Sequence, residues 1–417
     1  MMRILVLTQR LPYAPNRGDR LRVYHMLRHL RDHADVDLVS LVHDDEEAAH
    51  VDDVRGFVST VTALRVSSLQ SGINAAKALL TGRPLTHALL DAPGMTAALA
   101  RICAEHPPDV VFAYGSGMAR FALQPPLDRY PLVLDFVDVD SRKWRDMSGS
   151  AAVPKSWIYR REAATLGTFE ARAANAAVTA LVVNAREADN ARELAPSASV
   201  EVLANGVELE RLHPPIPPSA RPRVVFCGVM NYEPNAAGMT WFVERVWPLV
   251  KAARADATLS IVGPDPSAAF RALCGADPSI TIAGRVPDVR DWLWSSAVGI
   301  APLHVARGLQ NKALEAIAAG LPIVITEAVA GGLPPNAAHA SRVADTPQRF
   351  ADDVIDLLAL SPEQRRAMAA RSDLTQLAWR RTLEPLLPIL KRAAARRVAP
   401  VGTDHAIPRE PLPRSVA

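Results

Sequence analysis

The segment 301–322 carries the residues whose chemistry is easiest to interpret. A short apolar run leads into a glycine-containing turn, and a helical pattern then continues to Gly320, a residue type that commonly ends helices. Polar and cationic side chains gather at the helix start, namely Arg307, Gln310, Asn311 and Lys312. Cations there oppose the helix dipole unless an anion lies among them, so the cluster predicts a bound anion such as a diphosphate. Glu315 could accept hydrogen bonds from sugar hydroxyls; the alternative is a solvated basic helix start.

A second segment with chemical potential is acidic and follows another apolar run. It contains Asp135, Asp138 and Asp140. Side chains alternate along a strand, which would place Asp138 and Asp140 on one side and Asp135 on the other. Unpaired carboxylates are costly to bury, so we expect all three at the rim of a cleft. They could serve as a general base, bind hydroxyls or hold a metal, and the alternative is ion pairing with Arg142 and Lys143.

Two further turns contain glycines that would let the backbone approach a ligand. Gly18 and Asp19 follow the first apolar run and precede a helix, whose first amides could hold an anion; a stiff turn without ligand is the alternative. Gly228 begins a second such turn, with Asn231 inside it and Asn235 at the next helix start. Helix capping would explain Asn235 alone, but it would not explain the turn before it.

Short apolar runs that alternate with helical patterns must position these four segments. Strands are expected at 3–8, 37–42, 61–66, 109–114, 132–137 and 181–184, and then at 223–227, 258–262, 280–283, 298–302 and 322–326. Helical spacing appears at 20–30, 97–105 and 163–177. Strand–helix alternation in both halves predicts an α/β protein with two doubly wound Rossmann-like domains. Ligands of such sheets bind beyond the carboxyl ends of the strands, so we expect a cleft between facing domains.

A proline-rich stretch divides the two halves of the chain. Prolines at 214, 215, 217 and 218 cannot continue a helix or a central strand. We therefore expect a first, acceptor-side domain at 1–211, a linker at 212–222 and a second domain at 223–375. A terminal helix at 376–397 would pack back on the first domain, and 398–417 would form a disordered tail. The segment 376–397 also mixes basic and apolar residues, so a peripheral membrane contact is the alternative for it.

The composition bounds the class of protein. The 417 residues include 47 Lys and Arg against 44 Asp and Glu, a net charge of +3 that is too balanced to indicate nucleic-acid binding. Three scattered cysteines exclude a disulfide framework or zinc knuckle and fit a reducing compartment. No apolar stretch is long enough for a membrane-spanning helix, and residues 1–8 are typical of a buried strand rather than a signal peptide. We expect a cytoplasmic protein, at most peripheral at the inner membrane face.

These motifs resemble the GT-B architecture of nucleotide-sugar glycosyltransferases. Two segments resemble glycosyltransferase family 4. The segment 204–207 contains Asn-Gly-Val and resembles that family's turn of the same sequence, and the segment 314–324 resembles its second-glutamate helix. A fuller set resembles the sugar transferases of the PEP-CTERM/exosortase system in exopolysaccharide-producing bacteria; it comprises the segments 10–22, 138–144, 232–235 and 307–312. Together the resembling segments span nearly the whole chain except the tail.

The resemblance implies a retaining transfer of a sugar from a nucleoside diphosphate donor to a glycan or lipid-linked acceptor. Glu315 matches the glutamate that holds the donor ribose, and Gly18 matches the glycine near the donor phosphates. The Asp138 region lies roughly where related enzymes place an acceptor-side histidine. No protein nucleophile is expected, since the departing diphosphate can itself take the acceptor proton. The resemblance also implies no metal or cofactor, because metal-binding carboxylate pairs belong mainly to the other, single-domain glycosyltransferase architecture. The main physical task is then to neutralise charge on that diphosphate.

The sequence also departs from the family pattern. The wider family has a pair of glutamates separated by seven residues, and Arg307 stands at the place of the first. The usual Arg and Lys after the first strand of the second domain are missing, and the segment Val229–Asn235 offers asparagine instead. We infer that Arg307 and Lys312 supply the phosphate charge. A nucleotide-sugar epimerase and an inactive GT-B scaffold protein are the competing hypotheses.

Overall fold

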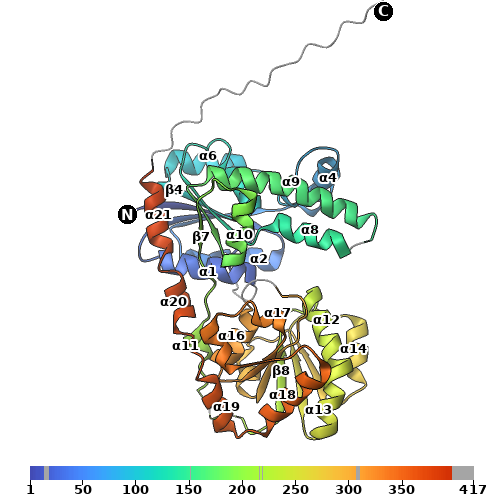
Figure 1. The fold of residues 1–417 in the computed structure, drawn as a ribbon. Helices are drawn as coiled ribbons and strands as arrows, with labels where there is room; N and C mark the ends of the chain where they lie inside the picture. The colour runs from blue at the N-terminus through green and yellow to red at the C-terminus, as the bar shows by residue number, and fades with distance from the viewer. Residues whose placement is uncertain (14–17, 151, 216, 218, 307–309, 397–417) are drawn as a thin grey trace, which may run out of the picture. The chain divides into compact units, whose positions relative to one another are not determined.

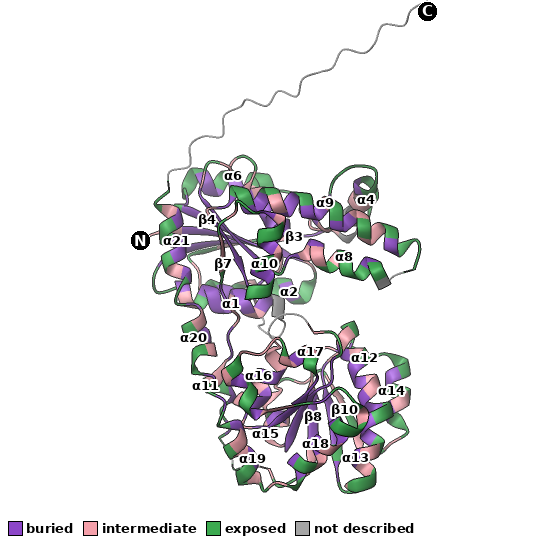
Figure 2. Cartoon of the chain, in the orientation of Figure 1, coloured by how far each residue is buried: buried purple, intermediate pink, exposed green. Residues whose placement is uncertain are grey.

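The computed structural model describes residues 1–396 except 14–17, 151, 216, 218 and 307–309. The chain divides into two compact units. The first contains residues 1–202 together with the segment from Pro385 onward, and the second contains Leu203–Glu384. Each unit is a parallel sheet covered by helices, with the buried residues concentrated in the strands and on the helix faces against them (Figures 1 and 2).

The first unit holds a seven-stranded sheet in the order β3-β2-β1-β4-β5-β6-β7, with all neighbours parallel. Its strands are β1 Arg3–Thr8, β2 Asp35–Val42, β3 Thr60–Arg65, β4 Val110–Tyr114, β5 Leu132–Val137, β6 Thr179–Val182 and β7 Val200–Val202. Its helices are α1 Gly18–Leu30, α2 Asp45–Ala49, α3 Val51–Arg55, α4 Ser68–Leu79, α5 Leu85–Leu89, α6 Met95–Glu105, α7 Ser116–Ala122, α8 Asp140–Ser150, α9 Lys155–Ala176, α10 Ala185–Leu194 and α21 Leu386–Ala394.

The second unit repeats this plan with six parallel strands in the order β10-β9-β8-β11-β12-β13. They are β8 Arg223–Cys227, β9 Thr258–Val262, β10 Ile280–Gly284, β11 Val298–Ala301, β12 Ile323–Ile325 and β13 Ser341–Val343. Its α-helices are α11 Leu209–Leu212, α12 Glu233–Trp241, α13 Trp247–Ala253, α14 Ala268–Gly275, α15 Arg290–Trp294, α16 Asn311–Ala318, α17 Glu327–Ala330, α18 Pro347–Ala359, α19 Pro362–Ala369 and α20 Trp379–Thr382. A π-helical turn at Phe242–Val246 joins α12 to α13, and short 3-10 turns lie at Pro335–Ala340 and Thr375–Leu377.

The predicted strands are all present, but two strands were not predicted. These are the edge strands β7 and β13, each three residues long and only partly buried. A strand that is exposed at the sheet edge lacks a continuous apolar run, which is the signal that identified the others.

The boundary between the units lies after Val202, ahead of the predicted boundary at residue 211. The reason is packing, because Val207 belongs to the core of the second unit and its amide donates to Leu377 O at 2.7 Å. A Cβ atom on Gly206 would lie 2.5 Å from the Trp379 backbone, so only glycine permits this close approach. The segment 203–211 and α20 are therefore bound to each other within the second unit, whereas α21 packs beside β4 and β5 of the first.

Candidate functional site

The second unit carries its polar cluster where the strand order reverses. β8 pairs on one side with β9 and on the other with β11, so the loops after β8 and β11 leave the sheet in neighbouring places. The first loop begins with Gly228 and leads into α12, and the second leads into α16. Such a reversal point at the carboxyl ends of parallel strands is the usual ligand site of doubly wound sheets.

Lys312 and Asn235 connect these two loops. Lys312 lies in the first turn of α16, and its Nζ donates to Asn235 Oδ1 at 2.9 Å. Asn235 is buried, and its Nδ2 donates to Val229 O at 2.8 Å, which fixes the orientation of the amide. The ammonium also lies 5.9 Å from the centre of the Phe226 ring. Burial lowers the pKa of Lys312 to about 8, because desolvation penalises its charged form.

Gly228 allows this close packing. A Cβ atom there would lie 2.9 Å from Asn235 Nδ2 and 3.0 Å from the Phe226 ring. The Gly228 amide donates to Val262 O at 2.9 Å, which continues the sheet contact with β9 into the turn. Asn231, the other predicted residue of this turn, is exposed and donates to Asp265 at 3.2 Å. Thus Asn235 meets Lys312, whereas Asn231 supports the neighbouring loop.

Glu315 lies one helical turn after Asn311 and is half-buried. Burial raises its pKa to about 7, and the positive charge of Lys312 opposes that shift. Burial also raises the pKa of the neighbouring Cys227 thiol, which excludes a reactive thiolate at this position. The local chemistry is therefore that of one ammonium and one carboxyl group at the same helix start.

Gln310 and Asn311 complete the helix start. Gln310 occupies the N-cap position, and its Oε1 lies 3.5 Å from Lys312 Nζ. Asn311 Oδ1 is buried and has no hydrogen-bond partner among the residues that the structure describes. Arg307, which was predicted to share the phosphate charge, lies outside the described residues. The described cluster therefore brings Gly228, Asn235, Gln310, Asn311, Lys312 and Glu315 to one end of the sheet.

The acidic segment of the first unit differs from its prediction at Asp135. This residue was expected at an exposed rim, but it is fully buried and accepts from Arg22 Nε at 2.8 Å. Arg22 is 1% exposed, so the pair is isolated from water. The rim expectation is wrong for Asp135 because it assumed an unpaired carboxylate, whereas α1 supplies a cation. Nor does Arg142 pair with this segment, since it contacts Glu193.

Val137 redirects the chain immediately after Asp135. Its φ is 66°, in the left-handed region that β-branched residues rarely adopt. The Asp138 amide donates to Phe136 O at 2.9 Å, and this bond closes a tight three-residue γ-turn around Val137. The Val137 amide donates to Asp135 Oδ1 at 3.0 Å, so the buried carboxylate also supports the turn. The simple alternation expected along the strand therefore stops at Val137.

Asp138 and Asp140 follow this turn and begin α8. Two buried carboxylates from other helices hold the helix start: Glu187 accepts from the Val139 amide at 2.9 Å, and Glu170 accepts from the Ser141 amide at 3.3 Å. Desolvation and the charges of Glu187 and Asp140 raise the pKa of Asp138 to about 6, while the residue keeps access to solvent. Burial also raises the pKa of Asp140.

Sequence reasoning did not single out Arg22, Glu170 or Glu187. A signal existed for Arg22, which lies one turn before Met26 and two before Leu30 and so occupies the apolar stripe of α1. Gly18 is the first residue of α1 and Asp19 the second, but the side-chain position of Asp19 lies outside the described residues. No group of three or more His, Cys, Asp or Glu side chains in the described chain could hold a metal ion.

Residues 221–360 match the family model described as Glycosyl transferases group 1. This stretch runs from β8 through α18 of the second unit. No curated protein sequence matches the chain. The family match supports placing the chain in the glycosyltransferase superfamily.

Solved structures resemble the chain over almost its whole length. Sucrose-phosphate synthase from Thermosynechococcus elongatus has a TM-score of 0.68 at 14% identity and covers 94% of this chain and 99% of its own. HepE from Anabaena in complex with UDP and glucose has a TM-score of 0.60 at 14% identity, covering 94% and 100%. The α,α-trehalose 6-phosphate synthase from Burkholderia multivorans has a TM-score of 0.60 at 12% identity, covering 95% and 99%. With its two parallel sheets, the chain has the two-domain GT-B fold.

Proposed function

We propose that this chain is a retaining glycosyltransferase of family 4 that transfers a sugar from a nucleoside diphosphate sugar to a glycan or lipid-linked acceptor. The observation that carries the proposal is Lys312, a half-buried ammonium in the first turn of α16. Its hydrogen-bond partners in the described part of the chain are the amide oxygens of Asn235 and Gln310, not carboxylates. A diphosphate would supply Lys312 with the charged hydrogen-bond acceptor that its two amide partners do not provide.

Lys312 would act on the donor by stabilising charge on the leaving diphosphate. As the bond between the sugar and the diphosphate breaks, negative charge develops on the bridging oxygen, and a preorganised cation lowers the free energy of that state. The acceptor hydroxyl attacks the sugar carbon on the same face, and its proton passes to the departing diphosphate. No protein nucleophile takes part. Glu315, whose pKa is about 7, would accept hydrogen bonds from the donor ribose.

Asp138 would serve the acceptor. It remains accessible to solvent, and with a pKa of about 6 it is mostly ionised at neutral pH and can accept a hydrogen bond that orients the acceptor hydroxyl. Asp140, Gly18 and Asp19 are proposed as further contacts of the bound substrates. The resemblance to the PEP-CTERM-associated sugar transferases supports a place in exopolysaccharide biosynthesis, which we propose occurs in the cytoplasm.

The experiment that tests the donor site compares a nucleoside diphosphate with its nucleoside. UDP and uridine are the first probes, because HepE was solved with UDP. Lys312→Ala should weaken UDP binding about tenfold or more, since a charge-assisted contact contributes roughly 1.5–3 kcal/mol, and should leave uridine binding nearly unchanged. Equal losses for both ligands would refute a phosphate role, and the absence of UDP and other nucleotide binding in the wild type would favour the scaffold hypothesis.

We also propose that the transfer needs no divalent metal. Activity measured with a chelator should equal activity without it. Loss of activity that added Mg²⁺ or Mn²⁺ restores would instead assign Asp138 and Asp140 to a metal site.

A further inference from the structure

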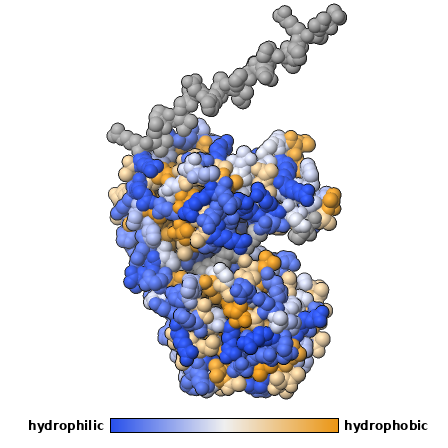
Figure 3. Space-filling model, viewed as in Figure 1, coloured by the Kyte–Doolittle hydropathy of each residue, from blue (hydrophilic) through white to orange (hydrophobic). Residues whose placement is uncertain are grey.

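Two neighbouring tips of the first unit expose large apolar side chains. Leu80 follows the end of α4 and is 90% exposed, and Ile73 on the same helix is 54% exposed. Val153 lies between α8 and α9 and is 84% exposed, and Trp157 in the first turns of α9 is 59% exposed. We call these four residues the tip surface. Figure 3 shows apolar colouring over the ends of α4 and of the α8–α9 hairpin. None of the four side chains helps to fill the hydrophobic core of the described chain, so their exposure calls for another explanation.

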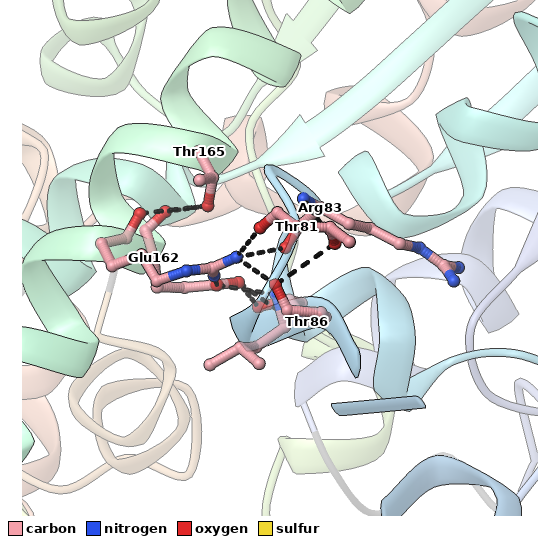
Figure 4. Close-up of polar contacts among 8 residues, drawn as sticks. Thr81, Arg83, Thr86, Glu162 and Thr165 are labelled. Atoms are coloured by element: carbon pink, nitrogen blue, oxygen red, sulfur yellow. Dashed lines mark hydrogen bonds and ion pairs between the residues drawn. The ribbon is translucent and has the colours of Figure 1, made fainter. Parts of the chain in front are cut away.

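Polar contacts join the two tips into one surface. The Arg161 guanidinium on α9 donates to the carbonyls of Ala78, Thr81 and Arg83, which bracket Leu80 (Figure 4). The adjacent Glu162 is buried and accepts from the amides of Leu85 and Thr86 at 2.7 and 2.8 Å. Arg161 lies one helical turn after Trp157, so both project from the same face of α9. The loop that carries Leu80 is thus held against the helix that carries Trp157.

Basic side chains surround the tip surface. Exposed cations lie on all three helices: Lys77 on α4, Arg145 on α8, and Lys155 and Arg160 on α9. The sequence has no acidic residue from 68 to 83 and none from 147 to 161. This local charge contrasts with a chain whose net charge is only +3. Apolar side chains at protruding tips within a basic field are typical of a surface that enters an anionic lipid interface.

We propose that the tip surface docks the first unit on an anionic lipid bilayer. Leu80, Val153 and Trp157 would enter the headgroup region, and the surrounding cations would contact lipid phosphates. A bilayer fits better than a protein partner because the apolar side chains of this surface are spread over two protruding tips, whereas the centre of a protein interface is normally a closely packed apolar patch. The terminal segment considered earlier for membrane contact does not compete, since Leu386, Ile389 and Leu390 of α21 are buried. No helix in the described chain is long and apolar enough to cross a membrane.

The tip surface also has a connection to the acidic edge of the sheet. α8 begins at Asp140 and ends at Ser150, immediately before the tip that carries Val153. A helix of this length spans about 16 Å at a rise of 1.5 Å per residue. Docking would therefore bring the Asp138–Asp140 turn to within roughly 15–20 Å of the lipid interface. That distance suits an acceptor whose sugar is linked to a lipid. This consequence rests on the proposed function, whereas the docking of the first unit on a bilayer does not rest on it.

The experiment measures co-sedimentation of the full chain with vesicles. Vesicles of phosphatidylcholine alone are compared with vesicles containing phosphatidylglycerol, each at low and high salt. The wild type should bind the anionic vesicles at low salt and lose affinity as salt is added. Lys155→Glu combined with Arg160→Glu should weaken binding at least tenfold, because each cation near such a surface contributes about 1 kcal/mol. Val153→Asp combined with Leu80→Asp should have an effect of similar size.

Matched controls separate docking from general charge or folding effects. Arg101→Glu combined with Arg186→Glu changes the net charge equally at exposed sites of the same unit, and Val343→Asp changes an exposed valine of the second unit. These variants should keep wild-type affinity, and all variants should keep the wild-type thermal unfolding profile. Brominated lipids should quench the tryptophan fluorescence of the wild type more strongly than that of the Trp157→Phe variant. Absence of vesicle binding, or equal losses in control and tip variants, would overturn the proposal. Salt-sensitive binding of acidic proteins without vesicle binding would assign the surface to a protein partner.

Discussion

The two units carry opposite chemistry at the carboxyl ends of similar parallel sheets. In the second unit, a glycine turn and a helix start hold Lys312 against Asn235, and burial lowers the pKa of the ammonium. In the first unit, the strained Val137 turn presents Asp138, and its surroundings raise the pKa of that carboxyl. Each site thus moves the pKa of its own principal group towards neutrality. A shared topology fixes where chemistry can occur, but the side chains fix its sign.

The supporting contacts differ as much as the charges do. The second site is held by close packing, with Gly228, Asn235 and Phe226 in contact. The first is held by buried carboxyl groups, since Asp135, Glu170 and Glu187 each accept from a backbone amide around the turn. Loss of the Arg22 cation should therefore destabilise the first unit, whereas loss of the Lys312 cation should weaken ligand binding by the second. The following predictions test this contrast.

The largest effect is expected from removal of the Arg22 cation. Arg22→Met leaves the buried Asp135 carboxylate without its guanidinium partner, which should destabilise the first unit by about 3–5 kcal/mol. Differential scanning calorimetry should show that the first unit unfolds at a lower temperature than it does in the wild type. Replacing both residues, as Arg22→Met with Asp135→Asn, should recover much of the loss, because the amide oxygen of asparagine can still accept from Val137. If the single variant unfolds like the wild type, the buried pair does not support this turn.

The next effect is a pH dependence that differs between the units. Burial raises the pKa of Glu170 from 4.5 to about 8, so the folded first unit binds this proton more tightly than the unfolded chain does. Stability from this group is therefore present at low pH and is lost as the pH rises towards about 8, by roughly 3 kcal/mol between pH 5 and pH 8. Glu170→Gln keeps the side-chain acceptor for Ser141 and should remove this slope. Chemical denaturation across this range measures it, and identical slopes in both proteins would contradict the assignment.

In the second unit, Lys312 should produce the opposite slope at higher pH. Its folded pKa of about 8 lies below the ordinary 10.5, so the folded state releases the proton more readily. Stability should therefore rise as the pH increases from about 8 to about 10.5, and Lys312→Met should abolish that rise. The pKa of Glu315 is raised from 4.5 to about 7, so this group should make the second unit less stable as the pH rises between these two values. A continued fall in the second unit's stability above pH 8 would show that the two sites respond alike.

Glu315 allows a smaller test that concerns binding rather than stability. Glu315→Ala should weaken binding of a nucleotide sugar about tenfold or more, because one or two hydrogen bonds to a charged acceptor contribute roughly 1.5–3 kcal/mol each. The unfolding temperature of the second unit should not decrease, since the replaced carboxyl is only half-buried and its surroundings disfavour its charged form. Isothermal titration with UDP-glucose, compared with Glu327→Ala as an exposed control, provides the measurement. Unchanged affinity would refute the donor-site assignment.

The two regions also differ in how much of them the sequence could predict. Apolar runs between helical patterns located the central strands, and the helix from Asn311 with Gly320 beyond its end has the predicted order. Glycine turns next to polar clusters likewise identified Gly228, Asn235 and Lys312, because each signal is local in the sequence. The pairing of Asp135 with Arg22 was not predicted, since it joins residues 113 positions apart and depends on how α1 packs on β5. Nor does any local pattern announce a left-handed valine.

Val137 provides the smallest and most specific test of the strained turn. At φ 66° any side chain with a Cβ atom is strained, whereas glycine is not. Val137→Ala removes packing and keeps the strain, and Val137→Gly removes both. The glycine variant should therefore be more stable than the alanine variant by about 1 kcal/mol, the reverse of the order found within ordinary strands. Ala113 of β4 gives the ordinary comparison, because it is a fully buried strand residue without a left-handed φ, so Ala113→Gly should lower the stability. If alanine is the more stable replacement at 137, the turn is not strained, and its hold on Asp138 comes from the carboxylates of Asp135 and Glu187 alone.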